Sequence, residues 1–216
     1  MTLNYLFWYS DTTAPHKTYV AVKVLSANAT GCIVSGLSAE YEVFKRIKSA
    51  NPRHPGLAHC LSIRHCFILR SSAGGHICFA TDVLGPNMIT LRSAQPNQTF
   101  PVSVAKRIIR QILLSVDYLH CEFGYIHTGN LCCVLVRWPG RLRNYVLDIK
   151  ADNVLASLPD QIDKYIEDHQ SATCDNLNPS YQIMKSKPLT NFNLDLRHLR
   201  VRLIDYGEGE KQWGFN

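Results

Sequence analysis

Four groups of charged residues, spread along the chain, have the types and the order that phosphoryl transfer requires. Lys23 ends the valine-rich run 20–23, and Glu40 opens a helical segment that follows it. The stretch 148–155 contains an Asp-x-Lys-x-x-Asn pattern, and the Asp-Tyr-Gly sequence 205–207 follows an apolar run. Phosphoryl transfer requires a cation on the phosphates, metal ions on oxygen ligands and a carboxylate that orients the attacking hydroxyl group. These residues therefore predict a phosphoryl-transfer site.

Taken singly, each of these groups has an ordinary structural explanation. A lysine at the edge of a strand is usually just solvated, and Glu40 could equally be a surface acid. Glu42 lies on a different face of the same helical segment, so it is expected to point away from Glu40. Only the occurrence of all four groups in one chain makes a shared site the better interpretation.

Together the four groups resemble the motifs of eukaryotic-type protein kinases. The resemblance implies that Asp148 is the base that accepts the proton of a substrate hydroxyl group and that Lys150 lies beside the γ-phosphate. It also implies that Asn153 and Asp205 bind magnesium, with Tyr206 standing where the family has phenylalanine. ATP and Mg²⁺ are the cofactors that follow from it.

The same resemblance assigns the contacts to the nucleotide. Lys23 is expected to contact the α- and β-phosphates, with Glu40 pairing with it. Thr81 takes the position of the gatekeeper, and the backbone of Asp82 and Leu84 is expected to meet the adenine. The predicted cofactor-binding residues are therefore Lys23, Glu40, Asp82 and Leu84.

Several segments point to one subgroup, the SR-protein kinases. The segment 76–85 is similar to the last strand of their N-lobe and the hinge, and 106–120 is similar to a long helix of their C-lobe. The sequence 124–128 leads toward the His-Thr-Asp version of the catalytic loop, and the polar stretch 159–193 resembles the spacer of fungal members. Specificity for serine and threonine is implied by this resemblance alone.

The elements that must position these residues fall into two halves. An α+β, two-lobe, protein-kinase-like fold is expected, with an N-lobe at 1–85 and a C-lobe at 86–216 joined at a Gly-Pro hinge. Hydrophobic patterns predict strands and helices of ordinary length. The expected strands are 19–25, 61–69 and 77–83, with a hairpin turn at 71–75, and the expected helices are 38–49 and 101–121.

Two departures concern the ends of the kinase pattern. No G-x-G-x-x-G sequence precedes Lys23, so the N-lobe is expected to lack its first strand and the Gly-rich loop over the phosphates. The chain ends nine residues after Gly207, so the mainly helical C-lobe is expected to be truncated. Both departures predict impaired catalysis.

A third departure lies inside the catalytic loop. Thr128 and Asp148 are adjacent in the family pattern, but here the 19 residues 129–147 separate them. Their composition is foreign to the rest, with three arginines and no acidic residue, and their codons at both junctions are compatible with splice sites. The segment is therefore interpreted as a retained intron, and a genuine surface insertion is the alternative.

Composition limits the other classes of function. The net charge of +6 comes from scattered basic residues, so direct nucleic-acid binding is not expected. RNA binding through the basic segment 129–147 is kept as a minor alternative. Eight cysteines without a C-x-x-C pair favour reduced thiols, and metal-site spacing is absent even in the densest Cys/His group, at 59–66. The longest apolar run, 131–136, is too short to span a membrane, and 1–10 lacks the features of a signal peptide. A soluble intracellular protein, cytoplasmic and/or nuclear, is expected.

These observations converge on one functional hypothesis with one alternative. The chain is expected to be a serine/threonine protein kinase that transfers the γ-phosphoryl group of ATP to protein hydroxyl groups, impaired by the departures above. Arg/Ser-rich splicing proteins are the expected substrates, and no membrane partner is expected. The alternative is a non-catalytic nucleotide-binding or scaffold protein, which is a pseudokinase in effect.

Overall fold

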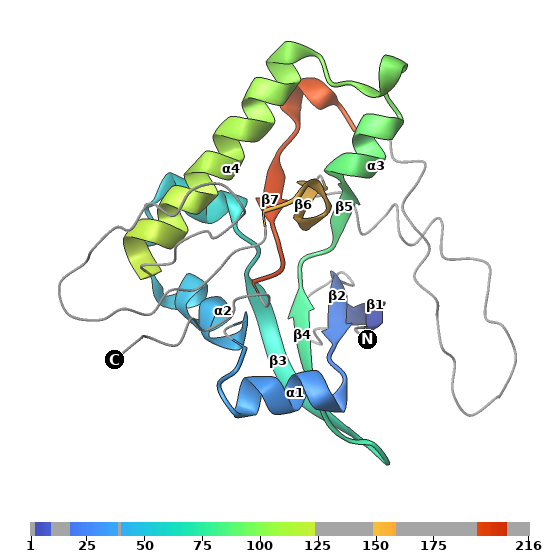
Figure 1. Cartoon of the computed structure of the whole chain (residues 1–216), viewed down its shortest axis with the longest axis vertical. Helices are drawn as coiled ribbons and strands as arrows, with labels where there is room; N and C mark the ends of the chain where they lie inside the picture. Colours follow the sequence, from blue (N-terminus) through green and yellow to red (C-terminus); the bar gives the residue numbers. More distant parts are fainter. Residues whose placement is uncertain (1–2, 10–17, 39, 124–148, 159–193, 207–216) are drawn as a thin grey trace, which may run out of the picture.

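The computed structural model describes residues 3–9, 18–38, 40–123, 149–158 and 194–206, and all structural statements below concern these residues. They form two groups of elements (Figure 1). One contains a four-stranded sheet with two helices, and the other contains a long helix, a short helix and a three-stranded sheet.

The first sheet is entirely antiparallel and carries Lys23. Its strands are β1 (Leu3–Tyr9), β2 (Thr18–Val24), β3 (Ile63–Ser71) and β4 (Gly74–Thr81), in the spatial order β1-β2-β4-β3. Three of these match the expected strands, and the hairpin between β3 and β4 falls at the expected turn. The sequence predicts no bounds for β1 and indicates only that the chain begins around the second strand of the kinase N-lobe. The pairing of β2 with β4 puts Lys23 opposite Phe79.

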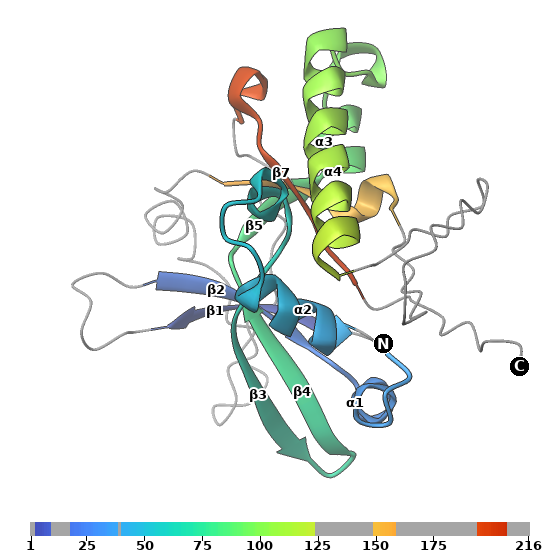
Figure 2. The same ribbon diagram turned by 90° about the vertical axis from the view of Figure 1, so that its left-hand side faces the viewer.

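Two helices accompany this sheet, α1 (Ala27–Val34) and α2 (Glu40–Ser49). The second confirms the helix expected at 38–49. Figure 2 shows α2 lying across the sheet and α1 near one end of it. The buried face of α2 consists of Val43, Phe44 and Ile47, and the Phe44 ring lies 5.2 Å from the ring of Phe79 on β4. This packing directs the first residue of α2, Glu40, toward β2.

The second group of elements is built on the helix α4 (Val102–Phe123), which confirms the helix expected at 101–121. It also contains β5 (Leu84–Asn87), α3 (Met88–Ser93), β6 (Val154–Ser157) and β7 (Val201–Leu203), and the three strands form an antiparallel sheet in the order β5-β6-β7. This sheet was not predicted, because strands of three or four residues are too short to show a hydrophobic period. The described part of this half is still mainly helical, as expected, because α3 and α4 contain more residues than the three strands together.

Four short 3-10 helices complete the described elements: η1 (Pro55–His59), η2 (Pro96–Gln98), η3 (Ala151–Asn153) and η4 (Leu196–His198). The first of them packs tightly on α4. A Cβ atom on Gly56 would lie 1.9 Å from the carbonyl oxygen of Leu114, so only glycine allows this approach.

One hydrophobic core runs through both groups of elements. It joins Phe44 of α2 and Phe79 of β4 to Tyr118 of α4, Leu203 of β7 and Tyr206. The link is continued in the backbone, where Cys60 forms a parallel bridge with Leu203. Since the core is continuous, the position of β7 relative to the first sheet is set by packing.

Candidate active site

Lys23 lies between two carboxylates that come from distant parts of the chain. Its Nζ is 2.6 Å from Oε1 of Glu40 and 3.4 Å from Oδ1 of Asp205, across sequence separations of 17 and 182 residues. We call Lys23, Glu40 and Asp205 the Lys23 triad. Glu42 does not take part, since its carboxylate pairs with Arg46 one turn along α2 at 3.2 Å. The contact between Lys23 and Glu40 that the sequence suggested is therefore present in the structure.

The triad is half-buried, and this environment sets its charges. Burial by itself lowers the pKa of Lys23, but the charges and hydrogen bonds of Glu40 and Asp205 outweigh it, so the pKa lies above its ordinary value. The Glu40 side chain is only 5% exposed, and its burial raises the pKa of this carboxyl group against the opposing charge of Lys23. Lys23 is therefore protonated at neutral pH, and one cation faces two carboxyl groups.

Asp205 follows β7 and is held in an uncommon backbone conformation. Its φ is +62°, in the left-handed region that non-glycine residues rarely adopt. The preceding residue is fixed by a hydrogen bond of 2.9 Å from the Ile204 N–H to the carbonyl oxygen of Asn153. The pairing of β6 with β7 therefore brings the two predicted metal ligands, Asn153 and Asp205, to neighbouring positions.

The donor chemistry of these two residues fits magnesium. Mg²⁺ prefers oxygen ligands and is commonly held by one or two protein side chains together with phosphate oxygens and water. Asp205 offers a carboxylate and Asn153 an amide oxygen. Within the described ranges no three His, Cys, Asp or Glu side chains gather into a metal cluster. Two oxygen donors of this kind suit an ion that also binds phosphate oxygens and water.

The other residues of the predicted catalytic loop are only partly described. Lys150 is exposed at the start of η3, and its carbonyl oxygen accepts a hydrogen bond of 2.9 Å from the Asn153 N–H. Within η3, Asp152 accepts a hydrogen bond from Asn87, the capping residue of α3. The predicted base Asp148 lies outside the described residues, as do the segments 129–147 and 159–193. Their roles stay predictions.

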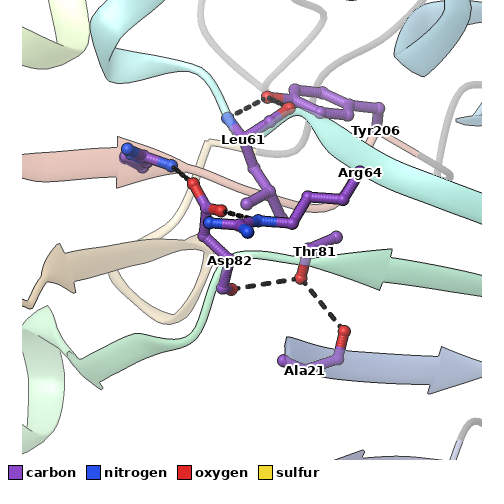
Figure 3. Close-up of polar contacts among 7 residues, drawn as sticks. Ala21, Leu61, Arg64, Thr81, Asp82 and Tyr206 are labelled. Carbon is purple, nitrogen blue, oxygen red and sulfur yellow. Dashed lines mark hydrogen bonds and ion pairs between the residues drawn. The ribbon is translucent and has the colours of Figure 1, made fainter. Parts of the chain in front are cut away.

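The predicted hinge contains a second charged group (Figure 3). The carboxylate of Asp82 lies 2.5 Å from Nε of Arg64 on β3 and 2.6 Å from Nη1 of Arg202 on β7. We call these three residues the Asp82 clamp. Burial alone raises the pKa of Asp82, but the two arginines outweigh it and hold the pKa below its ordinary value. The clamp ties the hinge to both sheets.

The residues on either side of Asp82 are also ordered. The hydroxyl group of Thr81 lies 3.2 Å from the Asp82 carbonyl oxygen and 3.4 Å from that of Ala21 on β2, so it donates to one of them (Figure 3). Leu84 begins β5 and pairs with Ser157. The predicted adenine contacts therefore lie where the first sheet passes into the second, and their role in binding stays a prediction.

Sequence reasoning missed three residues at this site. It assigned the backbone of Asp82 to adenine but did not foresee the pairing of its side chain with Arg64 and Arg202. It treated Tyr206 as a substitute for phenylalanine, although the hydroxyl group of this tyrosine makes contacts described below. No spacing rule could find the clamp, since its partners are 18 and 120 residues from Asp82.

The described cysteines and helices add little chemistry. Five described cysteines are free thiols, and burial raises the pKa of Cys60 to about 12, which removes it as a nucleophile at neutral pH. No helix in the described ranges is long and apolar enough to cross a membrane.

Comparison with known proteins gives relatives of one kind. No family model matches the chain. Protein kinase dsk1 of Schizosaccharomyces pombe is 29% identical over 152 residues, which are 70% of this chain and 24% of that protein. SRSF protein kinase 3 of Homo sapiens is 26% identical over 144 residues, 67% of this chain and 22% of the relative. The serine/threonine-protein kinase SKY1 of Saccharomyces cerevisiae is 26% identical over 148 residues, 67% of this chain and 17% of the relative.

The α+β fold and these relatives define the class as protein-kinase-like, which confirms the expected fold class. Within that class the chain resembles the serine/threonine kinases of the SR-protein-kinase-like group, as its motifs indicated. The chain spans about a quarter of the length of the first of these relatives and less of the other two. The lobe boundary at residue 85 and the nature of the segment 129–147 stay predictions.

Proposed function

We propose that this chain provides the nucleotide- and metal-binding part of a serine/threonine protein kinase. The observation that carries the proposal is the Lys23 triad. The ammonium group of Lys23 lies 2.6 Å from the carboxylate of Glu40 on α2 and 3.4 Å from the carboxylate of Asp205, which follows β7. A half-buried lysine with this pairing is pre-oriented to bind phosphate oxygens. The similarity to serine/threonine kinases supports the same reading.

Each residue of the site has a proposed task. Lys23 binds the α- and β-phosphates of ATP while Glu40 holds its ammonium group in place, and the backbone of Asp82 and Leu84 receives the adenine. Asp205 and Asn153 bind Mg²⁺, which neutralises charge on the phosphates when it is present.

The proposed chemical step belongs to the catalytic loop. Asp148 accepts the proton of a serine or threonine hydroxyl group as that group attacks the γ-phosphorus, and Lys150 lies beside the γ-phosphate. The position of 129–147 directly before Asp148 favours reduced activity, because a displacement of about 1 Å at a reacting group can lower a rate by about a hundredfold. That same position favours a nucleotide-binding pseudokinase as the second candidate function.

The proposed substrates and location rest on the relatives. One relative is named as a kinase of SRSF proteins, and we propose Arg/Ser-rich splicing proteins as the substrates of this chain as well. Such substrates agree with the proposed cytoplasmic or nuclear location. We propose no membrane partner and no direct binding of nucleic acid.

Two measurements test the proposal. A thermal-shift titration with Mg-ATP is expected to raise the melting temperature of the full chain, and absence of any shift would contradict nucleotide binding. A phosphotransfer assay with an Arg/Ser-rich peptide then compares the wild type with Asp148→Asn. Transfer that is lost in the variant supports the kinase, transfer that is unchanged sinks the assignment of the base, and binding without transfer supports the pseudokinase.

A further inference from the structure

Tyr206 is the most deeply buried residue of the candidate site and differs from the family motif by one hydroxyl group. Its side chain is 1% exposed. The ring packs edge-on against Phe44 of α2, with 5.3 Å between ring centroids. A phenylalanine would make the same ring contact, so what tyrosine adds at this position is the hydroxyl group.

The hydroxyl group is surrounded by main-chain partners from two segments (Figure 3). It accepts a hydrogen bond of 2.9 Å from the Leu61 N–H. Its own proton is donated to one of two carbonyl oxygens, that of Leu61 at 3.2 Å or that of Leu203 at 2.9 Å. A phenolic hydroxyl group carries one proton and can accept a second hydrogen bond, so it can make both kinds of bond at once.

These bonds join the residue after Asp205 to the segment that leads into β3. The Leu61 N–H is shared, since it also lies 3.0 Å from the Leu203 carbonyl oxygen. The peptide of Leu61 therefore keeps a partner if the hydroxyl group is removed. Tyr206, by contrast, loses both hydrogen bonds between its side chain and Leu61.

Asp205 needs support from its neighbours because its own backbone conformation is unfavourable. A residue other than glycine at positive φ costs free energy and persists only where the surrounding structure determines it. The support before it is the hydrogen bond from Ile204 to Asn153. The support after it is Tyr206.

We infer that Tyr206 is a positioning residue, whose hydroxyl group, anchored on Leu61 and Leu203, holds the Asp205 carboxylate against Lys23. The inference deepens the proposed function and rests on it, because the position of the Asp205 carboxylate matters for metal binding only if the chain binds Mg-ATP. A carboxylate kept beside Lys23 is pre-oriented for a divalent cation on the phosphates, whereas a carboxylate that turns away must be recovered at each binding event.

The test uses cross-linking, because it reports the position of Asp205 without nucleotide or metal. A water-soluble carbodiimide couples a carboxylate to an amine in contact with it, and mass spectrometry of digested full-length protein measures the Lys23–Asp205 and Lys23–Glu40 products. The ratio of the two products is the readout, with the 2.6 Å pair as internal reference. The variants are Tyr206→Phe and, as the matched control, Tyr118→Phe, which removes another buried hydroxyl group, 3.4 Å from the Ile47 carbonyl oxygen.

In Tyr206→Phe the ratio of the Asp205 product to the Glu40 product is expected to fall about fivefold, the population change expected for loss of one buried hydrogen bond. In Tyr118→Phe the ratio is expected to equal that of the wild type. An unchanged ratio in Tyr206→Phe overturns the inference, whether both products persist or both decline, because either result shows at most a structural role. Failure of Mg-ATP to bind the wild type would refute the proposed function and leave this readout intact.

Discussion

The Lys23 triad and the Asp82 clamp are charged groups of three built in opposite ways. The triad places one cation between two carboxyl groups, while the clamp places one carboxylate between two guanidinium groups. The triad thus has an excess of negative charge and the clamp an excess of positive charge. They also differ in the distances between their charged atoms: the triad includes a contact of 3.4 Å, whereas both contacts of the clamp are 2.6 Å or shorter.

The difference separates the proposed binding site from a structural tie. Glu40 has a raised pKa, which means that its environment does not fully compensate its charge, and a further cation would improve it. Asp82 has a lowered pKa, which means that its charge is more than compensated. The triad, which has too little positive charge for its two carboxyl groups, suits a metal ion that is bound to a nucleotide. The Asp82 carboxylate, which two arginines neutralise between the two sheets, suits a role in stabilising the fold.

Removing the central cation of the triad should have the largest effect. Lys23→Met leaves two carboxyl groups without their partner and the phosphates without their cation. We expect phosphotransfer, where the wild type shows it, to fall by about a hundredfold or more. We also expect the Mg-ATP thermal shift to disappear.

The control for that comparison is Lys45→Met, which removes an exposed lysine from α2. Its Mg-ATP thermal shift is expected to match that of the wild type. A similar loss in both variants would mean that general charge, and not the triad, attracts the nucleotide.

Breaking the clamp should reduce stability rather than binding chemistry. Asp82→Ala leaves the part-buried Arg202 and the exposed Arg64 without their acid, and we expect the free energy of unfolding to fall by about 2 kcal/mol in urea titrations. Arg202→Ala is expected to cost more than Arg64→Ala, because Arg202 is the less exposed arginine. A loss smaller than about 0.5 kcal/mol in Asp82→Ala would reduce the clamp to an ordinary surface pair.

The clamp also predicts a pH dependence with a definite sign. The folded protein holds the pKa of Asp82 below the ordinary value of 3.8, so it binds fewer protons than the unfolded chain as the pH falls. The stabilisation is complete above that value and is lost as the pH falls through the lower, folded-state pKa. The stability difference between the wild type and Asp82→Asn should therefore stay constant from about pH 7 to pH 5 and shrink below about pH 4. A difference that shrinks already near neutral pH would assign the effect to another group.

The smallest effect is expected at Glu42, two positions from Glu40 on the same helix. Glu42→Gln removes an exposed pair with Arg46 and should change the free energy of unfolding by no more than about 0.5 kcal/mol. The Mg-ATP thermal shift should not change. A larger effect on nucleotide binding at Glu42 than at Glu40 would show that the triad has been assigned to the wrong acid.

The sequence predicted best those features whose signals are local. Lys23 ends a strand-like run and Glu40 opens an amphipathic helix, so both could be found from short-range patterns and then combined through the kinase resemblance. The helix α4 was found for the same reason, since its apolar period extends over several turns. Asp205 was found because the Asp-Tyr-Gly sequence 205–207 follows an apolar run.

What the sequence could not predict depends on contacts between distant segments. The partners of Asp82 lie on β3 and β7, and nothing in the spacing of 18 and 120 residues marks them. The hydroxyl group of Tyr206 finds Leu61 only because the core brings β7 beside the segment before β3. The short strands β5, β6 and β7 likewise form only by pairing in one sheet, and their few residues have no hydrophobic period of their own.

The tie between Leu61 and Tyr206 has a consequence for how the chain acquires its structure during synthesis. The two residues are 145 positions apart, so the first sheet and α2 leave the ribosome long before the ring that packs on Phe44 is made. Contacts with such separation form late, because the intervening chain must first be closed into a loop. Until Tyr206 is synthesised, the nascent first half is therefore expected to expose the apolar surface around Phe44 on which this ring packs. A chaperone that binds this surface would protect the nascent chain until Tyr206 emerges.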